Sequence, residues 1–223
     1  MVDYYKKYIK YKYKYLHLQS ELIGGSHQQK ILIIHISGPS GSGKTTLGNK
    51  LSKTFGKKII VKDLDDLRLE FINHEYGGYA KMRTKIDKDK YQKWIDDFIN
   101  EQTKPIIFVG LNHMPWWHHN HYYDLHSQYN FYIKLDTDTI FKQKCGRFIT
   151  DVNNRQNEII NNIILDEKST IKNMQNQIQH ECGYDEIKKM NNIWNYDYKN
   201  QNYKILSRQK IFDAVSKLIN KEI

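Results

Sequence analysis

A glycine-rich stretch closed by a lysine and two threonines is the part of the sequence best suited to chemistry on phosphates. It reads HISGPSGSGKTTLGNKL over residues 35–51 and matches the pattern G-x-x-x-x-G-K-[ST]. Glycines let backbone N–H groups turn inward around a phosphate, and the N-terminus of a following helix adds a favourable dipole. The residues expected to bind a nucleoside triphosphate are Gly38, Pro39, Ser40, Gly41, Ser42, Gly43, Lys44, Thr45 and Thr46.

Two residues of this loop have roles of their own in the prediction. Lys44 is expected to reach the β- and γ-phosphates and so to act in catalysis, and the Thr45 hydroxyl is expected to ligate Mg²⁺. A flexible Gly/Ser linker would not lie between the apolar run ILIIHI and an amphipathic helix. The motif therefore predicts binding of ATP and Mg²⁺, with GTP left open.

Acidic residues follow the second apolar run, in IIVKDLDDLRLEF at 59–71. The carboxyl ends of strands in an α/β sheet face the ligand crevice, so Asp63, Asp65 and Asp66 are expected to open near the triphosphate. A carboxylate there can accept the proton of an attacking hydroxyl, as expected for Asp65, or support Mg²⁺, as expected for Asp63. Arg68, one helical turn after Asp65, could clamp the acceptor. The alternative is that these acids only cap a helix, with Asp65 or Asp66 accepting from its free N–H groups.

From residue 31 onward, strand-like runs alternate with segments of helical spacing. Strands are expected at 31–36, 58–63, 106–111, 129–135 and 203–207. Helices are expected between them, one of them from about Asp138 to Phe148, and polar helical segments between about 150 and 200 break at Gly183. This alternation predicts an α/β fold in which a parallel sheet is covered on both faces.

The loop and the acids together resemble a known group of enzymes. GPSGSGKTTL, followed some twenty residues later by Asp-x-Asp, is similar to small P-loop kinases of the adenylate kinase, shikimate kinase and uridine kinase group. The likeness covers roughly 31–155 and implies a P-loop three-layer α/β/α domain with a roughly five-stranded parallel sheet. It also implies that Asp65 is the general base and that Arg68 contacts the acceptor. DLDDLR is similar, too, to the Asp-Asp-Tyr-Arg element of polynucleotide 5′-hydroxyl kinases, with Leu67 in place of the aromatic residue.

Kinases of this group carry a lid after the fourth strand, and its arginines close over the triphosphate. By this resemblance Arg147 is expected to stabilise the charge on the transferring phosphate, and Arg155 is expected to bind the nucleotide. Arg147 also suits the simpler role of a cation near a helix C-terminus. The lid or insertion is expected at about 149–200. One departure from the group is the third strand, which lacks an acid, so magnesium support falls to Asp63 or Asp65.

A segment rich in histidine and tryptophan, LNHMPWWHHNHYYDLH, follows the third strand. Its spacing enforces no metal geometry, and no cysteine joins it. The segment could form a wall of the acceptor pocket, with Trp116 or Trp117 stacking a base, or a partly buried surface loop. The histidines concerned are His113, His118, His119, His121 and His126.

The first 25 residues differ from the rest. A stripe of tyrosine and leucine at helical spacing, surrounded by lysines, predicts an N-terminal amphipathic helix at 1–25, ahead of a kinase-like domain at 31–223. The helix could pack on the body or on a second copy, anchor the chain to a membrane or nucleic acid, or be a processed leader. It resembles leaders of proteins from large cytoplasmic DNA viruses, which implies a viral protein in the host cytoplasm or the virion.

Charge and cysteine content narrow the setting. A formal charge of +10 and a pI near 9.3 suit a polyanionic partner such as a nucleotide or nucleic acid, and suit codon drift in an AT-rich genome equally well. No apolar run approaches the roughly 20 residues of a bilayer-spanning helix, so a cytoplasmic protein without a transmembrane segment is expected. Cys145 and Cys182 are expected to be reduced thiols, with a disulfide as the alternative.

These observations favour a magnesium- and ATP-dependent kinase. The expected acceptor is a small molecule, such as a nucleoside, a nucleotide or a related metabolite. The base-reading motif Asn-Lys-x-Asp of GTPases does not occur, and the adjacent acids of motor and AAA-type ATPases do not follow the third strand. Two alternatives stay open, a polynucleotide 5′-hydroxyl kinase and an ATP-binding or ATP-hydrolysing module that docks to a partner. The oligomeric state stays open as well.

Overall fold

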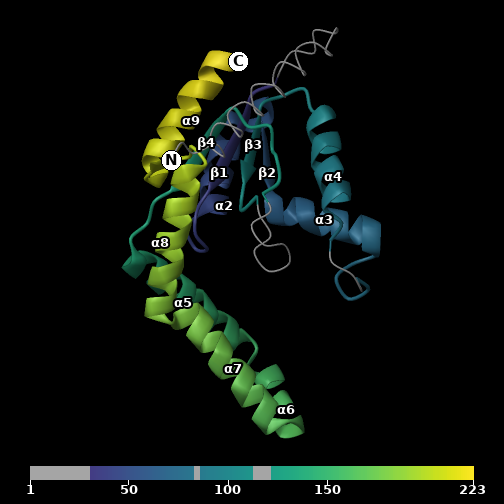
Figure 1. Cartoon of the computed structure of the whole chain (residues 1–223), viewed down its shortest axis with the longest axis vertical. Coiled ribbons are helices and arrows are strands. Elements are labelled where there is room, and N and C mark those ends of the chain that lie inside the picture. Colours follow the sequence, from purple (N-terminus) through teal and green to yellow (C-terminus); the bar gives the residue numbers. More distant parts are fainter. Residues whose placement is uncertain (1–30, 83–85, 113–121) are drawn as a thin grey trace, which may run out of the picture. The chain divides into compact units, whose positions relative to one another are not determined.

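Five short parallel strands form the centre of the protein. The structure is a computed structural model, and it describes residues 31–82, 86–112 and 122–223. Within these residues the strands pair in the order β2-β3-β1-β4-β5 (Figure 1). They are β1 (Ile33–Ser37), β2 (Ile60–Asp63), β3 (Ile106–Val109), β4 (Tyr129–Ile133) and β5 (Lys204–Leu206). Each strand lies within one of the apolar runs, give or take a residue at an end, so the prediction of a five-stranded parallel sheet is confirmed.

Helices connect the strands, and most of them begin at a capping side chain. They are α2 (Lys44–Phe55), the 3₁₀ helix η1 (Gly56–Lys58), α3 (Leu64–Tyr76), α4 (Lys88–Asn100), α5 (Thr137–Asn154), α6 (Gln156–Leu165), α7 (Glu167–Cys182), α8 (Tyr184–Asn200) and α9 (Arg208–Glu222). The side chains that accept hydrogen bonds from first-turn amides are those of Asp63, Asp87, Asp136, Asp166 and Ser207. A short polar or acidic residue directly after a strand or loop therefore marks where most of these helices start.

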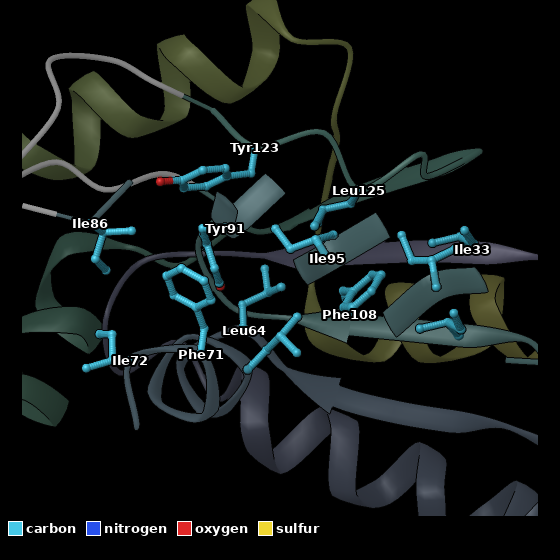
Figure 2. Packing of buried hydrophobic residues seen from close by; sticks show 13 residues of the cluster. Ile33, Leu64, Phe71, Ile72, Ile86, Tyr91, Ile95, Phe108, Tyr123 and Leu125 are labelled. Atoms are coloured by element: carbon cyan, nitrogen blue, oxygen red, sulfur yellow. The ribbon is translucent and has the colours of Figure 1, made fainter. Parts of the chain in front are cut away.

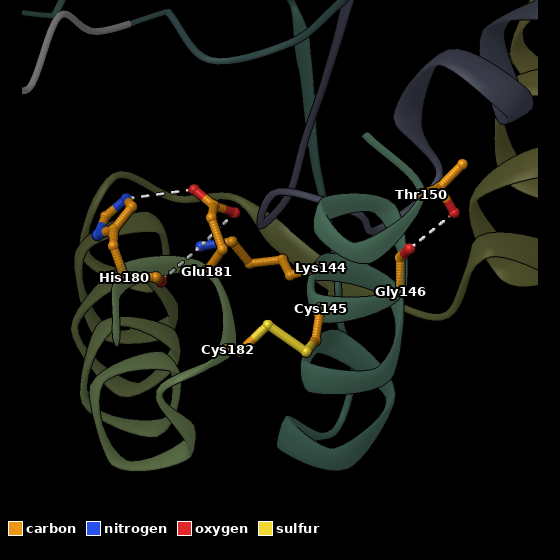
Figure 3. The surroundings of a disulfide bond; sticks show 7 residues. All are labelled: Lys144, Cys145, Gly146, Thr150, His180, Glu181 and Cys182. Carbon is orange, nitrogen blue, oxygen red and sulfur yellow. Dashed lines mark hydrogen bonds and ion pairs between the residues drawn. A yellow bond between two sulfur atoms is a disulfide. The ribbon is translucent and has the colours of Figure 1, made fainter. Parts of the chain in front are cut away.

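The helix expected to end near Phe148 continues to Asn154, which corrects the predicted boundary. Neither glycine nor proline interrupts the chain between these two residues. The Thr150 hydroxyl donates to the Gly146 carbonyl at 2.9 Å, one turn back (Figure 3). The neighbouring helices α7 and α8 also pack along α5. Tertiary packing therefore lengthens the helix beyond its amphipathic pattern.

Helices cover both faces of the sheet, so the strands are apolar on both sides. On one face α3 and α4 pack through residues such as Phe71 and Ile95 against Ile33 and Phe108 (Figure 2). On the other face α2 and α9 pack on the strand residues that alternate with these, among them Ile34. The three-layer α/β/α architecture expected from the sequence is confirmed.

The strand order places the glycine-rich loop after β1 at the middle of the sheet edge. β1 lies between β3 and β4, and the chain leaves β1 for β2 and later crosses β1 to reach β4. Ligands of open α/β sheets bind outside the carboxyl ends of the strands where the chain changes direction in this way. Gly48 allows α2 to approach the sheet closely, since a Cβ atom there would lie 3.0 Å from Val61 Cγ1 and 3.2 Å from Val109 Cγ1.

A buried histidine holds the centre of the sheet together. His35 on β1 is fully buried, with Nε2 3.0 Å from the Gly110 carbonyl and Nδ1 2.6 Å from the Tyr203 hydroxyl. Because a carbonyl oxygen only accepts hydrogen bonds, Nε2 carries a proton, while the Tyr203 hydroxyl can either donate to Nδ1 or accept from it. The imidazole thus links β1, the residue after β3 and the residue before β5.

A disulfide joins Cys145 of α5 to Cys182, the last residue of α7 (Figure 3). The expectation of reduced thiols is therefore wrong for this structure. The two cysteines are 37 residues apart in sequence, but α5 and α7 pack on one another and bring the Cα atoms to 4.7 Å. Sequence spacing alone does not reveal such a pairing. Beside the disulfide, Lys144 Nζ lies 3.5 Å from Glu181 Oε2.

The expected division of the chain into a leader, a domain and a lid stays a prediction. The amphipathic helix at 1–25 lies outside the described residues, and the boundaries proposed for the kinase-like domain and for the lid at about 149–200 stay predictions. The region expected to form the lid is spanned by four helices, α5, α6, α7 and α8. Of these, α6 and α7 pack on one another. Among the described helices, none combines the length and the apolar character needed to cross a bilayer.

Candidate active site

A cavity of about 440 Å³ opens at the carboxyl edge of the sheet. It collects residues from the loop after β1, the end of β2, the start of α3, the helix α5 and the start of α9. The lining residues are Ser40, Gly41, Gly43, Lys44, Thr45, Thr46, Asp63, Asp65, Gln143, Arg147 and Arg208. The structure thus brings most of the predicted loop together with Asp63, Asp65 and Arg147, and it adds two residues that had not been predicted, Gln143 and Arg208.

The loop needs glycine at several points. Gly41 and Gly43 have φ angles of 81° and 80°, in the left-handed region that favours glycine. The Ser42 N–H donates to the Pro39 carbonyl at 3.0 Å, which closes a tight turn. A Cβ atom at Gly38 would lie only 2.7 Å from Ser42 Oγ. No side chain caps the N-terminus of α2 and no acid lies in its first turn, so its first amides are available to an anionic ligand.

Lys44 is folded onto the loop that precedes it. Its ammonium group donates to the carbonyls of Gly38 at 2.9 Å and Pro39 at 3.1 Å. Burial lowers the pKa of Lys44 from 10.5 to about 8, the nearby Asp65 and Asp63 partly oppose this effect, and Arg147 adds to it. The lysine lies in the hollow of the loop, where phosphate oxygens could take the place of the carbonyls.

Asp63 joins two elements of the site. Its Oδ1 atom caps α3 by accepting from the Asp65 N–H at 3.0 Å, and its Oδ2 atom accepts from the Thr45 hydroxyl at 3.1 Å. The residue that caps α3 is therefore Asp63, not Asp65 or Asp66 as the capping alternative expected, and Asp63 also contacts the loop. Carboxylate and hydroxyl oxygens suit Mg²⁺, which proteins hold through one or two carboxylates plus substrate phosphates. Within the described part of the chain, no group of three or more His, Cys, Asp and Glu side chains offers another metal site.

Asp65 and Arg68 form an ion pair at the edge of the cavity. Arg68 Nη2 lies 2.7 Å from Asp65 Oδ1, and the Asp65 side chain is 75 % exposed whereas that of Arg68 is 21 % exposed. Arg68 reaches beyond the cavity into a water-sized space of about 10 Å³ that Tyr91 and Tyr123 also line. Burial raises the pKa of Tyr91, which the Arg68 guanidinium partly opposes. Asp66 is exposed and does not line the cavity.

α5 presents one face to the loop. Arg147 Nη2 donates to Ser40 Oγ at 3.0 Å, and Gln143 lies one turn earlier on the same helix. A Cβ atom at Gly41 would lie 3.3 Å from Gln143 Cβ and 3.4 Å from Arg147 Nη2, so the helix and the loop are in close contact. Arg147 therefore lies in the middle of α5 beside the glycine-rich loop, not at the C-terminus of a helix.

The structure does not bring Arg155 to the cavity. It lies at the junction of α5 and α6, and its guanidinium forms two 2.9 Å contacts with the Glu158 carboxylate and a 3.4 Å contact with Asp151. About half of its side chain is exposed. These acids lie three residues after and four residues before Arg155, so a local helical ion-pair network holds the arginine in place. The contact between Arg155 and a nucleotide that the family resemblance implies has no support in this arrangement.

Arg208 and Gln143 could have been found from the sequence. Arg208 follows the fifth strand by two residues, so the rule that carboxyl ends of strands face the ligand applies to it as it does to Asp65. A Cβ atom at Gly43 would lie 2.7 Å from Arg208 Nη1, which shows how closely the guanidinium covers the loop. Gln143 is four residues before Arg147 and therefore shares its face of the helix.

A second cavity of about 480 Å³ adjoins the first and shares Thr46 and Arg208 with it. Its walls combine apolar side chains with lysines from the end of β4 and from α2. The lining residues are Thr46, Leu47, Lys50, Lys134, Leu135, Ser207, Arg208, Gln209 and Phe212. Lys50 Nζ lies 4.0 Å from the centre of the Phe212 ring, so this ring is already engaged with a cation.

The histidine- and tryptophan-rich segment is described only at its ends. His113, His118, His119 and His121, with Trp116 and Trp117, lie outside the described residues, and their predicted roles stay predictions. The ends of the segment are joined, since the Tyr123 N–H donates to the Asn112 carbonyl at 2.8 Å. His126 lies apart from the cavity, with Nε2 3.0 Å from Asp96 Oδ1 and Nδ1 3.5 Å from Asp124 Oδ2.

Comparison with known proteins shows similarity of structure only. No family model and no curated protein matches the chain. Among solved structures, tRNA delta(2)-isopentenylpyrophosphate transferase from Staphylococcus epidermidis is similar at a TM-score of 0.48 and 14 % sequence identity, over 86 % of this chain and 100 % of that chain. An uncharacterized protein from Eubacterium ventriosum is similar at a TM-score of 0.37 and 16 % identity, over 86 % of this chain and 99 % of that chain. Because both TM-scores are below 0.5 and both identities are below 20 %, neither likeness bears on the chemistry of the cavity.

Proposed function

We propose that the protein is a magnesium- and ATP-dependent kinase that transfers the γ-phosphoryl group to a small acceptor. The observation that carries the proposal is the convergence on one cavity of the phosphate-binding loop, the Thr45–Asp63 contact, Asp65 and Arg147. These residues come from three separate segments of the chain. Each has a defined task in phosphoryl transfer, namely holding phosphate, supporting a cation, accepting a proton and stabilising charge.

The nucleotide is expected to lie across the two adjoining cavities. The amides at the start of α2 and the Lys44 ammonium would bind the phosphates in the first cavity. The second cavity has the apolar side chains of Leu47, Leu135 and Phe212 and is of a size to hold a base and part of a ribose. Because Thr46 and Arg208 line both cavities, the cavities adjoin and one nucleotide can occupy both at once.

Thr45 and Asp63 are the residues that fit Mg²⁺. Their oxygen atoms lie 3.1 Å apart at the floor of the cavity, and both are of the hard type that this ion prefers. When bound with ATP, the ion supplies positive charge that neutralises the phosphate oxygens. Asp63 is fixed by its role as the cap of α3, so its second oxygen is positioned in advance.

Transfer would proceed by in-line attack of an acceptor oxygen on the γ-phosphorus. The new P–O bond forms as the bond between the γ-phosphorus and the bridging oxygen breaks, and ADP leaves with the bridging oxygen. Asp65 accepts the proton of the attacking oxygen, and Arg68, at 2.7 Å, holds the carboxylate in place. Arg147, fixed beside the loop by Ser40, stabilises the charge on the transferring group.

The acceptor is expected to lie beside Asp65 and Arg68. The guanidinium of Arg68 is mostly buried and lies next to the tyrosines of the water-sized space, so it can offer donors to an oxygen-rich acceptor. A nucleoside, a nucleotide or a related metabolite has the hydroxyl or phosphate oxygens that such donors require. The exposed Asp65 carboxylate pairs with Arg68 and also lines the cavity of the loop.

The test follows labelled γ-phosphate from ATP into nucleosides, nucleotides and 5′-hydroxyl oligonucleotides. Label is expected in a small acceptor, and it should be absent with Lys44→Ala but present with Lys53→Ala, an exposed lysine of the same helix. Label in oligonucleotides alone would instead identify a polynucleotide kinase. Loss of ATP without any acceptor, unchanged by Asp65→Ala, would overturn the kinase proposal and favour an ATP-hydrolysing module.

A further inference from the structure

Arg208 occupies a position between the two cavities. It is the first residue of α9, directly after the capping residue Ser207, and it lines both cavities. Its guanidinium lies against the backbone of Gly43, the residue immediately before Lys44. A Cβ atom at Gly43 would come within 2.7 Å of Nη1 and 3.3 Å of Cδ. The arginine therefore covers the start of α2, where the loop amides are exposed to a ligand.

The charge of Arg208 is not neutralised by the described part of the protein. None of the ion pairs among the described residues includes it, whereas Arg68 and Arg155 both have carboxylate partners. It also begins a helix whose first turn contains no acid, and a cation is unfavourable at that end of a helix dipole. Lys44 and Arg147 add their charges to the same cavity. An anion in the cavity would relieve all of these unfavourable interactions.

We infer that Arg208 is a nucleotide-binding residue that contacts the α- and β-phosphates of a nucleotide lying across the first and the second cavity. This inference rests on the proposed binding of a nucleoside triphosphate but not on the transfer step. In loops of this type the amides at the start of the helix bind the α- and β-phosphates. Arg208 lies over this part of the loop, at Gly43 and Thr46, whereas Arg147 contacts the opposite part, at Ser40.

The two arginines therefore have different predicted tasks. Arg147 acts on the end of the triphosphate that reacts, and its loss should lower turnover. Arg208 acts on phosphates that ATP and ADP share, and its loss should weaken both nucleotides by the same factor. Hydrogen bonds to charged groups of this kind correspond to roughly 10- to 100-fold in affinity.

The experiment measures binding of ATP, ADP and inorganic tripolyphosphate by calorimetry, without acceptor, to the full chain and to Arg208→Ala. Binding of all three probes is expected to weaken by roughly 10- to 100-fold. Lys210→Ala removes the same charge from an exposed position two residues along α9 and should bind as the wild type does. Because Arg208→Ala removes a cation from a helix N-terminus, the variant should fold, which circular dichroism and thermal melting verify.

Each outcome decides a separate question. Unchanged affinity of Arg208→Ala for all three probes would overturn the inference, and weakening of ATP alone would overturn the assignment to the α- and β-phosphates. Weakening of the nucleotides with no effect on tripolyphosphate would place Arg208 on the base or ribose and also overturn it. Equal weakening supports the inference even if no acceptor takes up phosphate, whereas wild-type protein that binds none of the probes would remove the basis of both proposals.

Discussion

The Thr45 hydroxyl donates to Oδ2 of Asp63 across 3.1 Å, and this bond joins the first turn of α2 to the end of β2. The same carboxylate caps α3 through its other oxygen. Asp63 thus connects the glycine-rich loop, the sheet and the helix that carries Asp65. Any movement of Asp63, the proposed magnesium ligand, would therefore also move Asp65, the proposed base.

Replacing Asp63 by asparagine should weaken the response to magnesium. Asparagine keeps an oxygen that can cap α3, so stability should change little, while the negative charge at the cation site is lost. The magnesium concentration that gives half of the maximal transfer rate is expected to rise by roughly 10- to 100-fold. A magnesium titration at saturating ATP measures this. Asp136→Asn, a cap on α5 outside the cavity, should leave the titration unchanged.

Replacing Asp65 by asparagine should slow transfer while ATP still binds. The amide cannot accept the proton of the attacking oxygen, so turnover is expected to fall by roughly 10²- to 10⁴-fold. The ion pair with Arg68 is lost as well, although the amide oxygen can still accept a hydrogen bond. Single-turnover kinetics and nucleotide titration separate the two steps. Turnover equal to that of Asp97→Asn, an exposed acid of α4, would remove Asp65 from the mechanism.

Nucleotide affinity should fall as the pH rises through about 8, because burial lowers the pKa of Lys44 to this value and the neutral amine binds phosphate poorly. Affinity for ATP should be roughly tenfold lower one pH unit above the pKa, in a range where the phosphates stay fully ionised. Titrations at several pH values measure this. In Lys44→Arg the guanidinium stays charged, so any binding that remains should not change over the same range.

Stability of the unliganded protein should respond to Lys44 with the opposite sign. The folded pKa of about 8 lies below the unfolded value of 10.5, so between these values the unfolded chain binds more protons than the folded chain. The contribution of this group to the free energy of unfolding therefore rises with pH across that window. Denaturant unfolding of wild type and Lys44→Met at pH values on both sides of 8 checks the difference. A wild-type free energy of unfolding that fell or stayed constant relative to that of Lys44→Met as the pH rose through this window would contradict the lowered pKa.

Removing the disulfide should destabilise the helices that it joins. The bond closes a segment of 37 residues, which by loop-closure entropy corresponds to about 4 kcal/mol of unfolding free energy. Denaturant unfolding of the wild type should shift to a lower midpoint when a reducing agent is added. The double variant Cys145→Ser, Cys182→Ser should show the lower midpoint without the reagent and no further shift with it. A wild-type midpoint that is the same with and without the reducing agent would mean that the disulfide contributes nothing to the free energy of unfolding.

Much of the fold could be predicted because it depends on patterns that lie close together in the sequence. Runs such as ILIIHI are apolar throughout because both faces of the sheet are covered, and the glycine-rich loop is recognisable from its flanking strand and helix. The rule for carboxyl ends of strands located Asp63 and Asp65, and it would have located Arg208 had it been applied to the fifth strand. Arg208 was therefore predictable from the sequence in the same way as the two acids.

Other features depend on information that local patterns do not contain. The pairing of Cys145 with Cys182 follows from how α5 and α7 pack, which no spacing of two cysteines reveals. The position of Arg155 shows the reverse situation, since its acids Asp151 and Glu158 are visible in the sequence at helical spacing. These local ion pairs hold Arg155 at the junction of α5 and α6, away from the cavity, although a resemblance to lid arginines predicts a contact with the nucleotide.

The hydrogen bonds between Lys44 and the carbonyls of Gly38 and Pro39 add a cost to the binding of any anion by the loop. An incoming anion must displace two internal partners before it can use the lysine. Chloride or a single inorganic phosphate offers little in exchange, whereas a chain of linked phosphates meets the lysine, the amides and two arginines at once. The loop should therefore bind small anions such as chloride only weakly and bind ligands with linked phosphates much more tightly.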